Sequence, residues 1–431
     1  MPGMRRLYGI LVRLAAPLAA ALVLIRGLRN AAYREGFAER FGFGAAVGVT
    51  RCIWLHAVSL GEVTAAAALV RGLQRRHPST PILVTTATPT GRAKARSLFG
   101  STVTVRYLPY DTPGAVARFL RGANPCAAIV METELWPNLL QHCARRGVPV
   151  VLASARLSAR SVSTYRRFGS LFRDLFTANV TVAAQSAEDA DRFALIGAAA
   201  ARIHVVGNVK FDIEVPHSLL EQAHALRLGS FAGRPIWIAG STHAGEEQAV
   251  LCAHRALLPA VPAALLILAP RHPDRFGRVA AMLDGAGLRW ARRSGGQPVP
   301  AEATVLLLDS IGELGLFYGA ADIAFVGGSL VPVGGHNLLE PAALGVPVLT
   351  GPSNDNGREI AAVLSAAGAA LIVADAADLA ANLIALFGDA ARRRRIGEAG
   401  RAAVYTQRGS VGRLLDLIDA RIAAAADGAG G

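Results

Sequence analysis

The sequence predicts an α/β protein with two Rossmann-like halves, each built on a parallel, doubly wound sheet. Short apolar runs alternate with helical segments along most of the chain, which is typical of parallel βαβ units. A polar helical stretch at residues 218–228 separates these runs into two series. The length of 431 residues and the 52% of hydrophobic residues suffice for two or three domains with full cores.

The first series of strands begins with an apolar run at residues 53–58. A turn at 59–62 and a helix at 63–75 follow it, and Gly207-Asn208 ends the series. Its further strands are predicted at residues 82–86, 103–107, 127–131, 149–153 and 180–184.

The second series forms the other half of the protein. Its strands are predicted at residues 235–239, 264–269, 304–308, 322–326 and 346–350. We therefore expect an N-terminal segment at residues 1–30, an N-terminal domain at 31–207 and a C-terminal domain at 208–425. Because ligands of open parallel sheets bind at the carboxyl ends of the strands, we expect the site in a cleft between the two domains.

The stretch at residues 327–352, GGSLVPVGGHNLLEPAALGVPVLTGP, is a candidate nucleotide pocket. It joins two buried strands through a glycine-rich turn and a helix predicted at 338–344. Glycines let backbone N–H groups approach a ligand, and the helix start at Asn337, with His336 and Glu340 beside it, favours phosphate. The alternative is that the glycines only serve a strand-to-helix turn, as in any α/β domain.

Charged side chains directly follow several other predicted strands. Glu62 stands at a helix start, where it is either a carboxylate of the cleft or a capping group. Glu132 lies in the motif METELWPN, an unusual sequence to build for stability alone. Lys210 is either a compact charge chosen for the site or an ordinary surface lysine. Arg271 follows a strand in a position to hold a phosphate with two hydrogen bonds.

The formal net charge of +14 indicates an anionic partner. The chain has neither zinc-finger spacing nor an arginine-rich tail, so we expect no nucleic acid among its partners. Its four cysteines are scattered and are most simply read as reduced, buried thiols. A membrane surface and an acidic substrate remain as candidate anionic partners.

The N-terminal segment favours the membrane surface. Residues 7–25 are apolar except for Arg13, and arginines flank them on both sides. A spanning helix needs about 20 mostly apolar residues, and an arginine within it is costly. Without a credible cleavage site, we predict an uncleaved anchor that either spans the membrane or lies in its interface, with its arginines at anionic headgroups. The alternative is an ordinary buried helix.

A series of motifs along the chain carries a family resemblance. In order, they are HAVSLGE, TTATPTG, LPYDTP, METELWPN, ARLSARS, GNVKFD, GSTHAGEE, PRHPDRF, FVGGSLVPVGGHNLLEPA and VPVLTGP. With them the chain resembles the 3-deoxy-D-manno-octulosonic acid (Kdo) transferases over nearly its whole length. The resemblance implies a GT-B glycosyltransferase that transfers Kdo from CMP-Kdo to the lipid A precursor (lipid IVA) of lipopolysaccharide. It also implies inversion at the anomeric carbon and a location on the cytoplasmic face of the inner membrane.

The same resemblance implies roles for individual residues. Glu62 matches the general base of the family, and Glu132 and Lys210 match positions that stabilise the transition state. The implied CMP contacts are Pro270, Arg271, Ile311, Gly312, Glu313, Asn337, Leu338, Leu339 and Glu340. Ile311 stands where the family often has methionine, which matters little if this contact is made through the backbone.

These roles agree with the chemistry of the transfer. The attacking hydroxyl must lose a proton, for which a carboxylate is the expected base. The charge that builds on the departing CMP calls for arginine, lysine or N–H groups. The chain has no Asp-X-Asp motif with a supporting acidic cluster, so we predict no essential metal and no cofactor beyond the donor substrate.

Two other functions fit the same scaffold. A nucleotide-sugar epimerase would use a UDP-sugar and need neither anchor nor lipid acceptor, but it would have no reason to contain METELWPN. A catalytically silent lipid A-binding protein would not need Glu62, Glu132 and Lys210 intact.

Overall fold

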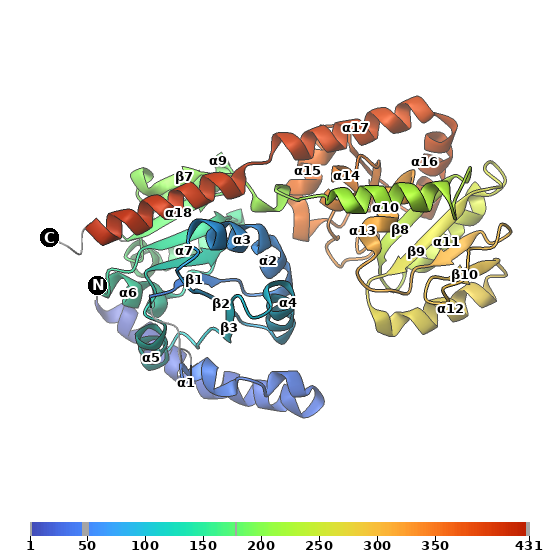
Figure 1. Ribbon diagram of the computed structural model, residues 1–431. Coiled ribbons are helices and arrows are strands. Elements are labelled where there is room, and N and C mark those ends of the chain that lie inside the picture. The colour runs from blue at the N-terminus through green and yellow to red at the C-terminus, as the bar shows by residue number, and fades with distance from the viewer. Residues whose placement is uncertain (1, 45–50, 177–178, 428–431) are drawn as a thin grey trace. The chain divides into compact units, whose positions relative to one another are not determined.

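The computed structural model describes residues 2–44, 51–176 and 179–427. Contacts between residues divide the chain into two compact units (Figure 1). The N-terminal unit comprises Met1–Asp212 and Arg408–Gly431, and the C-terminal unit comprises Ile213–Gln407. Within the described residues each unit holds a seven-stranded parallel sheet, which confirms the two predicted Rossmann-like halves.

The sheet of the N-terminal unit has the strand order β3-β2-β1-β4-β5-β6-β7. Its strands are β1 (Ile53–His56), β2 (Ile82–Thr86), β3 (Thr104–Tyr107), β4 (Ala127–Met131), β5 (Val150–Ala155), β6 (Val180–Ala184) and β7 (Ile203–Val205). Its helices are α1 (Pro2–Arg29), α2 (Leu60–Ala65), α3 (Ala67–Arg76), α4 (Pro89–Phe99), α5 (Pro113–Ala123), α6 (Pro137–Arg145), α7 (Ala159–Arg167), α8 (Gly169–Arg173), α9 (Ala187–Leu195) and α18 (Ser410–Asp427).

Both faces of this sheet are buried, as the apolar runs predict for parallel strands. Successive side chains of a strand point to opposite faces. Trp54 of β1 accordingly packs in one core cluster with Phe119 of α5, and Leu55 packs in the other with Val70 of α3. The predicted helix at 63–75 is observed as the separate helices α2 and α3, which meet at Ala66.

The sheet of the C-terminal unit has the strand order β10-β11-β9-β8-β12-β13-β14. Its strands are β8 (Ile236–Thr242), β9 (Leu265–Pro270), β10 (Trp290–Arg292), β11 (Val305–Leu307), β12 (Ile323–Val326), β13 (Val348–Thr350) and β14 (Ala370–Ile372). Its helices are α10 (His217–Leu228), α11 (Glu246–Leu257), α12 (Phe276–Gly285), α13 (Leu314–Ala320), α14 (Leu339–Ala343), α15 (Arg358–Ala366), α16 (Ala376–Gly388) and α17 (Ala390–Thr406).

The two edge strands of this sheet, β10 and β14, were not predicted from the sequence. Each is three residues long and has a neighbour on one side only. Ile372 of β14 is 56% exposed, and the residues of β10 are half-buried or exposed. A short edge strand therefore lacks the continuous apolar run by which buried parallel strands are recognised.

The C-terminal helix α18 changes the expected domain boundaries. Residues 208–425 were expected in the C-terminal domain, whereas residues 208–212 and 408–431 belong to the N-terminal unit. Leu414 and Ile418 of α18 are fully buried in the core cluster that contains α3. Gly72 of α3 leaves the space that Leu415 fills, because a Cβ there would lie 2.5 Å from the leucine side chain.

Helix α1 confirms the predicted N-terminal apolar helix. Its segment Leu7–Arg29 is long and apolar enough to cross a membrane, and only 17% of its apolar window is buried. The buried positions include Ala16 and Ala20, whereas Leu14 and Leu18 are 71% and 66% exposed. Much of the apolar surface of α1 is therefore not used by the core.

Replacing Leu414 with alanine tests whether α18 is part of the N-terminal core. We expect Leu414→Ala to lower the free energy of unfolding by about 2–5 kcal/mol, because it removes a fully buried side chain and leaves a cavity. Leu195→Ala is the matched control, since Leu195 of α9 is 60% exposed, and it should change stability by less than about 0.5 kcal/mol. Equal stabilities in urea unfolding would show that α18 does not contribute to this core.

Candidate functional site

Glu62 lies where β1 gives way to α2, at the carboxyl edge of the N-terminal sheet. Ser59 has an extended backbone and is the N-cap of α2, so Glu62 falls in the first turn. Its Oε2 accepts a hydrogen bond from the Val58 N–H at 2.8 Å, and its Oε1 accepts one from the Ser59 hydroxyl at 3.3 Å. The carboxylate thus does take part in the local turn, as the capping alternative proposed.

The surroundings of Glu62 nevertheless raise the pKa of its carboxyl group well above the ordinary value. Its pKa is raised from the ordinary 4.5 to about 7, mainly by burial and also by the negative charges of Glu132 and Glu134, against the lowering effect of the Val58 hydrogen bond. A carboxyl group with this pKa exchanges a proton readily near neutral pH. A capping role does not require such a shift, so Glu62 is the candidate base of the site.

Glu132 and Lys210 form an ion pair near Glu62. The Lys210 Nζ donates to Glu132 Oε1 at 2.9 Å, and both side chains are partly buried. Asn208 fixes the lysine by accepting from its backbone N–H at 3.0 Å. Because β1 and β4 are adjacent in the sheet, the residues that follow them meet at one edge. The predicted trio of Glu62, Glu132 and Lys210 is therefore brought together.

The backbone of Glu132 is strained. Its φ is +55°, in the left-handed region that costs a residue with a side chain about 1–2 kcal/mol. Its N–H still bonds to the Ala153 carbonyl at 2.9 Å, so the strain occurs where β4 ends and not in a loose loop. Strain of this kind persists where the surrounding structure enforces it, commonly at functional sites.

The glycine-rich stretch after β12 is organised around the buried carboxylate of Glu246. This carboxylate accepts from the backbone N–H groups of Gly328 at 2.6 Å, and of Ser329 and Leu330 at 2.9 Å. It also accepts from the His243 N–H at 2.9 Å. The N–H groups of residues 328–330 are thus bound to Glu246 and do not face a ligand.

The glycines of the turn serve close packing. Gly328 has a φ of +71°, and a Cβ on it would lie 2.8 Å from the His336 ring. A Cβ on Gly327 would lie 2.7 Å from the Ser241 carbonyl oxygen. The alternative raised from the sequence, in which the glycines serve the turn itself, therefore holds for the first part of the stretch.

Three histidines gather at the carboxyl ends of the adjacent strands β9, β8 and β12. The rings of His243 and His336 stack at 5.0 Å with their Nε2 atoms 2.8 Å apart, and His272 packs edge-on against His243 at 5.2 Å. The pKa of His336 is lowered to about 4, mainly by burial and then by the positive charges of His243, Arg271 and His272. The pKa of His243 is also lowered, mainly by burial.

His243 and His336 act as neutral hydrogen-bonding groups at neutral pH, because the pKa of each lies below its usual range. The sequence analysis singled out His336 but assigned no role to His243 or His272. Their shared position after neighbouring strands was the available signal, since PRHPDRF and GSTHAGEE each carry one histidine just beyond a strand.

The predicted nucleotide contacts lie at the same edge of the C-terminal sheet. Pro270 ends β9, and Arg271 is exposed beyond it, with its backbone N–H bonded to the Thr242 carbonyl at 2.9 Å. Ile311 is 82% exposed, and Gly312 has a φ of +92°. The strand order β11-β9-β8-β12 brings the loops that carry these residues side by side.

Other members of the predicted set have side chains engaged within the protein. Arg293 binds both carboxylate oxygens of Glu313 at 2.7–3.3 Å, which lowers the pKa of Glu313. Leu338 and Leu339 are buried, so they offer backbone groups only. The Asn337 side chain donates to Glu340 at 3.1 Å and accepts from the Leu339 N–H at 3.1 Å.

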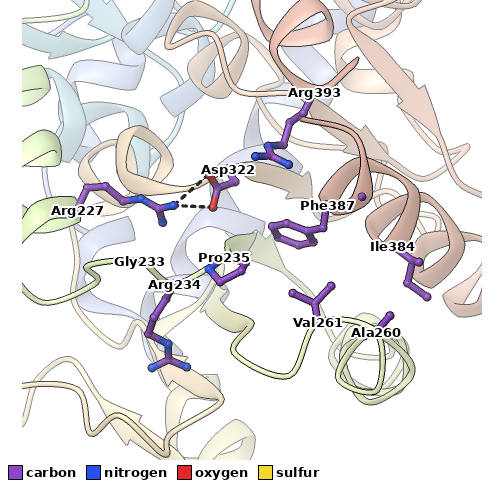
Figure 2. Close-up of a pocket in the computed structure, with 11 residues that line it drawn as sticks. Arg227, Gly233, Arg234, Pro235, Ala260, Val261, Asp322, Ile384, Phe387 and Arg393 are labelled. Atoms are coloured by element: carbon purple, nitrogen blue, oxygen red, sulfur yellow. Dashed lines mark hydrogen bonds and ion pairs between the residues drawn. The ribbon is translucent and has the colours of Figure 1, made fainter. Parts of the chain in front are cut away.

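A cavity of about 490 Å³ lies away from all of these residues (Figure 2). It opens beside Pro235 and Asp322, which precede β8 and β12, at the amino edge of the C-terminal sheet. Arg227 donates to both oxygens of Asp322 at 2.9 and 3.1 Å. The cavity is therefore separate from the candidate site. Across the described ranges, no three His, Cys, Asp or Glu side chains are grouped to hold a metal ion.

Replacing Glu246 with glutamine tests its role in holding the glycine-rich turn. Each carboxylate oxygen accepts hydrogen bonds from two backbone N–H groups. In glutamine an NH₂ group replaces one of these oxygens, so it would face two backbone N–H groups that then have no acceptor. We expect Glu246→Gln to lower the free energy of unfolding by about 3 kcal/mol and to speed hydrogen exchange at residues 328–330. Glu302→Gln, at an exposed position, is the control. Unchanged exchange would mean that Glu246 does not order the turn.

Comparison with known proteins shows which family the chain resembles. Residues 35–213 match the family model described as 3-Deoxy-D-manno-octulosonic-acid transferase (kdotransferase). The 3-deoxy-D-manno-octulosonic acid transferase of Haemophilus influenzae is 41% identical over 417 residues, which cover 96% of this chain and 98% of the relative. That of Bordetella pertussis is 39% identical over 431 residues, covering 96% and 99%.

A solved structure shows the same fold. The glycosyltransferase from Rickettsia africae ESF-5 matches with a TM-score of 0.57 over 86% of this chain and 99% of its own, at 12% sequence identity. The predicted GT-B fold is thereby confirmed. The two relatives share substantial identity with this chain over nearly its whole length. The chain therefore belongs to the 3-deoxy-D-manno-octulosonic acid (Kdo) transferase family of glycosyltransferases.

Proposed function

We propose that this Kdo transferase moves Kdo from CMP-Kdo to a lipid A precursor, lipid IVA, with inversion at the anomeric carbon. We place the reaction on the cytoplasmic face of the inner membrane. The observation that carries the proposal is Glu62, a half-buried carboxyl group with a pKa of about 7 beside the Glu132–Lys210 ion pair. The chain needs no metal and no cofactor beyond its donor substrate in this scheme.

Glu62 acts as the general base of the transfer. A hydroxyl of the acceptor attacks C2 of Kdo and passes its proton to the Glu62 carboxylate as the new bond forms. The bond from C2 to the CMP phosphate oxygen breaks, and the electron pair leaves with CMP. Direct attack from the face opposite the leaving group gives inversion. Glu62 is suited to this step because its pKa lies near the working pH.

Glu132 and Lys210 stabilise the charges of the transition state. Lys210 already binds Glu132 at 2.9 Å, so its ammonium group is fixed in place before any substrate arrives. A pre-positioned cation loses little free energy on reorganisation when negative charge develops beside it. Glu132 in turn holds the lysine and contributes a negative charge for the positive character that develops at C2.

The donor nucleotide binds at the carboxyl edge of the C-terminal sheet. Arg271 is exposed there and can give two parallel hydrogen bonds to a phosphate. His243 and His336 lie next to it as neutral rings, since their pKa values are low. One hydrogen bond joins their Nε2 atoms, so one of the two rings keeps an N–H for a ligand. Pro270, Ile311, Gly312, Glu313 and residues 337–340 complete the proposed CMP contacts.

The acceptor explains the charge and the N-terminal helix together. A lipid A precursor carries phosphates and acyl chains, so it is held in an anionic membrane. The net charge of +14 favours such a surface, and α1 exposes a long row of leucine and isoleucine side chains. We infer that α1 anchors the protein where its acceptor is found.

The direct test is transfer by the purified full chain. The protein is incubated with lipid IVA and freshly generated CMP-Kdo, and the products are read by mass spectrometry. A mass increase by one or more Kdo units supports the proposal. Intact acceptor, with intact donor and folded protein, would contradict it, and CMP- and UDP-sugars would then be compared by the rise in melting temperature that each ligand gives.

The pH profile of Glu62 provides a first prediction about this reaction. A base must be ionised, so kcat/KM should rise as the pH passes through about 7 and level off above it. Glu62→Gln should lower kcat by about 10²–10⁴-fold with CMP affinity unchanged. Because the folded pKa is raised, ionisation of Glu62 costs stability as the pH rises from 4.5 through 7. Glutamine removes this cost, so the variant should be at least as stable as the parent at pH 8.

The exposed Glu188 supplies the control for this substitution. Glu188→Gln should leave both kcat and its pH dependence unchanged, since Glu188 lies on α9 with its side chain 74% exposed. Near-normal turnover of Glu62→Gln would remove Glu62 from the role of base. A lost activity that accompanies a lower melting temperature at pH 8 would instead assign it the structural role of a cap.

Arg271 provides the second prediction. Arg271→Ala should weaken CMP binding about tenfold or more, because a charge-assisted hydrogen bond contributes about 1.5–3 kcal/mol. Arg278→Ala removes the same charge from an exposed position of α12 and should leave the affinity unchanged in calorimetric titration. Equal losses in both variants would indicate general electrostatic attraction, and no loss in Arg271→Ala would exclude its phosphate contact.

A further inference from the structure

The face of α1 that packs on the N-terminal unit consists of small residues. Gly9, Ala16, Ala20 and Gly27 are buried, and their spacings of seven, four and seven place them in one row along the helix. The row thus marks the side of α1 that faces the N-terminal unit.

The opposite face of α1 consists of large apolar side chains. Leu7, Leu14 and Ile25 are 55%, 71% and 58% exposed, and they lie in a second row about half a turn from the first. Arg13 is exposed between the two rows. A helix whose large apolar side chains point outward along its whole length offers a continuous apolar surface that a bilayer can cover.

Asp111 fixes the N-terminal end of α1. The Tyr8 hydroxyl donates to Asp111 Oδ2 at 2.9 Å, across more than a hundred positions of sequence. Asp111 is only 4% exposed. Figure 1 shows α1 beginning near α6 and running past α5.

The same carboxylate caps the helix that follows the METELWPN loop. Its oxygens accept from the backbone N–H groups of Asn138 at 3.0 Å and Leu139 at 2.8 Å, at the start of α6. The Asn138 side chain donates back to the Asp111 carbonyl at 2.5 Å. One carboxylate therefore joins α1 to the end of the loop that begins with Glu132.

The segment after α1 returns to the same edge of the sheet. The Tyr110 N–H, next to Asp111, donates to the Arg40 carbonyl at 2.8 Å. The buried Arg40 side chain donates to the Ala87 carbonyl at 3.1 Å and lies over the Tyr107 ring at 4.0 Å. The N-terminal end of α1 and the segment that follows the helix are thus both tied to loops at the carboxyl edge of one sheet.

We propose that α1 lies flat in the surface of an anionic bilayer, and that Asp111 couples this docked helix to the loop that carries Glu132. The proposal rests on the membrane-bound function proposed above. A spanning helix would carry Tyr8 about 30 Å along the helix axis from the point where the chain leaves α1 at Asn30, away from Asp111. The membrane-facing row of α1 and the base-bearing edge of the sheet are then parts of one rigid unit.

The depth of α1 in a bilayer tests the first half of the proposal. Leu7, Leu14 and Ile25 share one face but are spread over about 27 Å of helix axis. Each is replaced in turn by cysteine and labelled with a nitroxide in the full chain. Cys126→Ser and Cys252→Ser remove the accessible native thiols, whereas Cys52 and Cys143 are buried. Depth is measured by power saturation on vesicles of phosphatidylethanolamine and phosphatidylglycerol.

The depths of the three labels distinguish a flat helix from a spanning one. Equal, shallow depths at the three positions support the flat helix. Depths that pass from one interface through the bilayer centre to the other overturn it, while leaving Kdo transfer itself intact. Failure of the chain to bind these vesicles overturns both the flat helix and the membrane anchoring of the proposed function, but not the transfer seen with detergent-dispersed acceptor.

The Tyr8 hydroxyl tests the coupling. Tyr8→Phe removes the hydrogen bond to Asp111 and keeps the ring. We expect the nitroxide at Leu7 to become more mobile while that at Ile25 does not, and kcat with lipid IVA in vesicles to fall at least threefold with CMP affinity unchanged. Tyr33→Phe, on the segment beyond α1, is the matched control. Unaltered mobility and unaltered kcat in Tyr8→Phe would overturn the coupling, as would an equal loss in Tyr33→Phe.

Discussion

The parallel direction of all described strands is the constraint on which both candidate sites depend. In a parallel sheet every loop that follows a strand opens at the same edge. Glu62 and Glu132 meet because β1 and β4 are neighbours, and His243, His272 and His336 meet because β8 lies between β9 and β12. The cavity beside Asp322 lies at the other edge of its sheet and contains none of the residues predicted from the sequence.

Carboxylates away from solvent have two different roles in this protein, one structural and one in the candidate site. The number of backbone N–H donors around each carboxylate distinguishes the two roles. Glu246 accepts four N–H groups and is fully committed to the turn after β12. Glu62 accepts one N–H group and one hydroxyl, and other acids lie near it. Donors stabilise the ionised form of a carboxyl group, whereas burial and neighbouring negative charge raise its pKa. Few donors therefore leave Glu62 able to take up a proton.

Asp111 stands between these two cases. It accepts two backbone N–H groups from α6, as a helix cap does, and a hydroxyl from α1. A cap is ordinarily a local device, but here the hydroxyl donor comes from the N-terminal helix. Helix α1 is consequently attached to the protein next to the loop that carries Glu132 and not through a free linker. This attachment gives the apolar face of α1 a fixed direction relative to Glu132 and Lys210.

The sequence by itself determined the fold class and the strands of the interior, and it supplied the candidate residues of the site. Alternation of apolar runs with helices is a local property, so β2, β4 and β6 were predicted with the observed bounds, and motifs such as METELWPN identified Glu132. Only the tertiary structure decided that α18 completes the N-terminal core, that Arg293 binds Glu313, and that Glu246 occupies the N–H groups of the glycine-rich turn. These are contacts between segments distant in sequence, and no periodicity or short motif records which partner a buried charge will find.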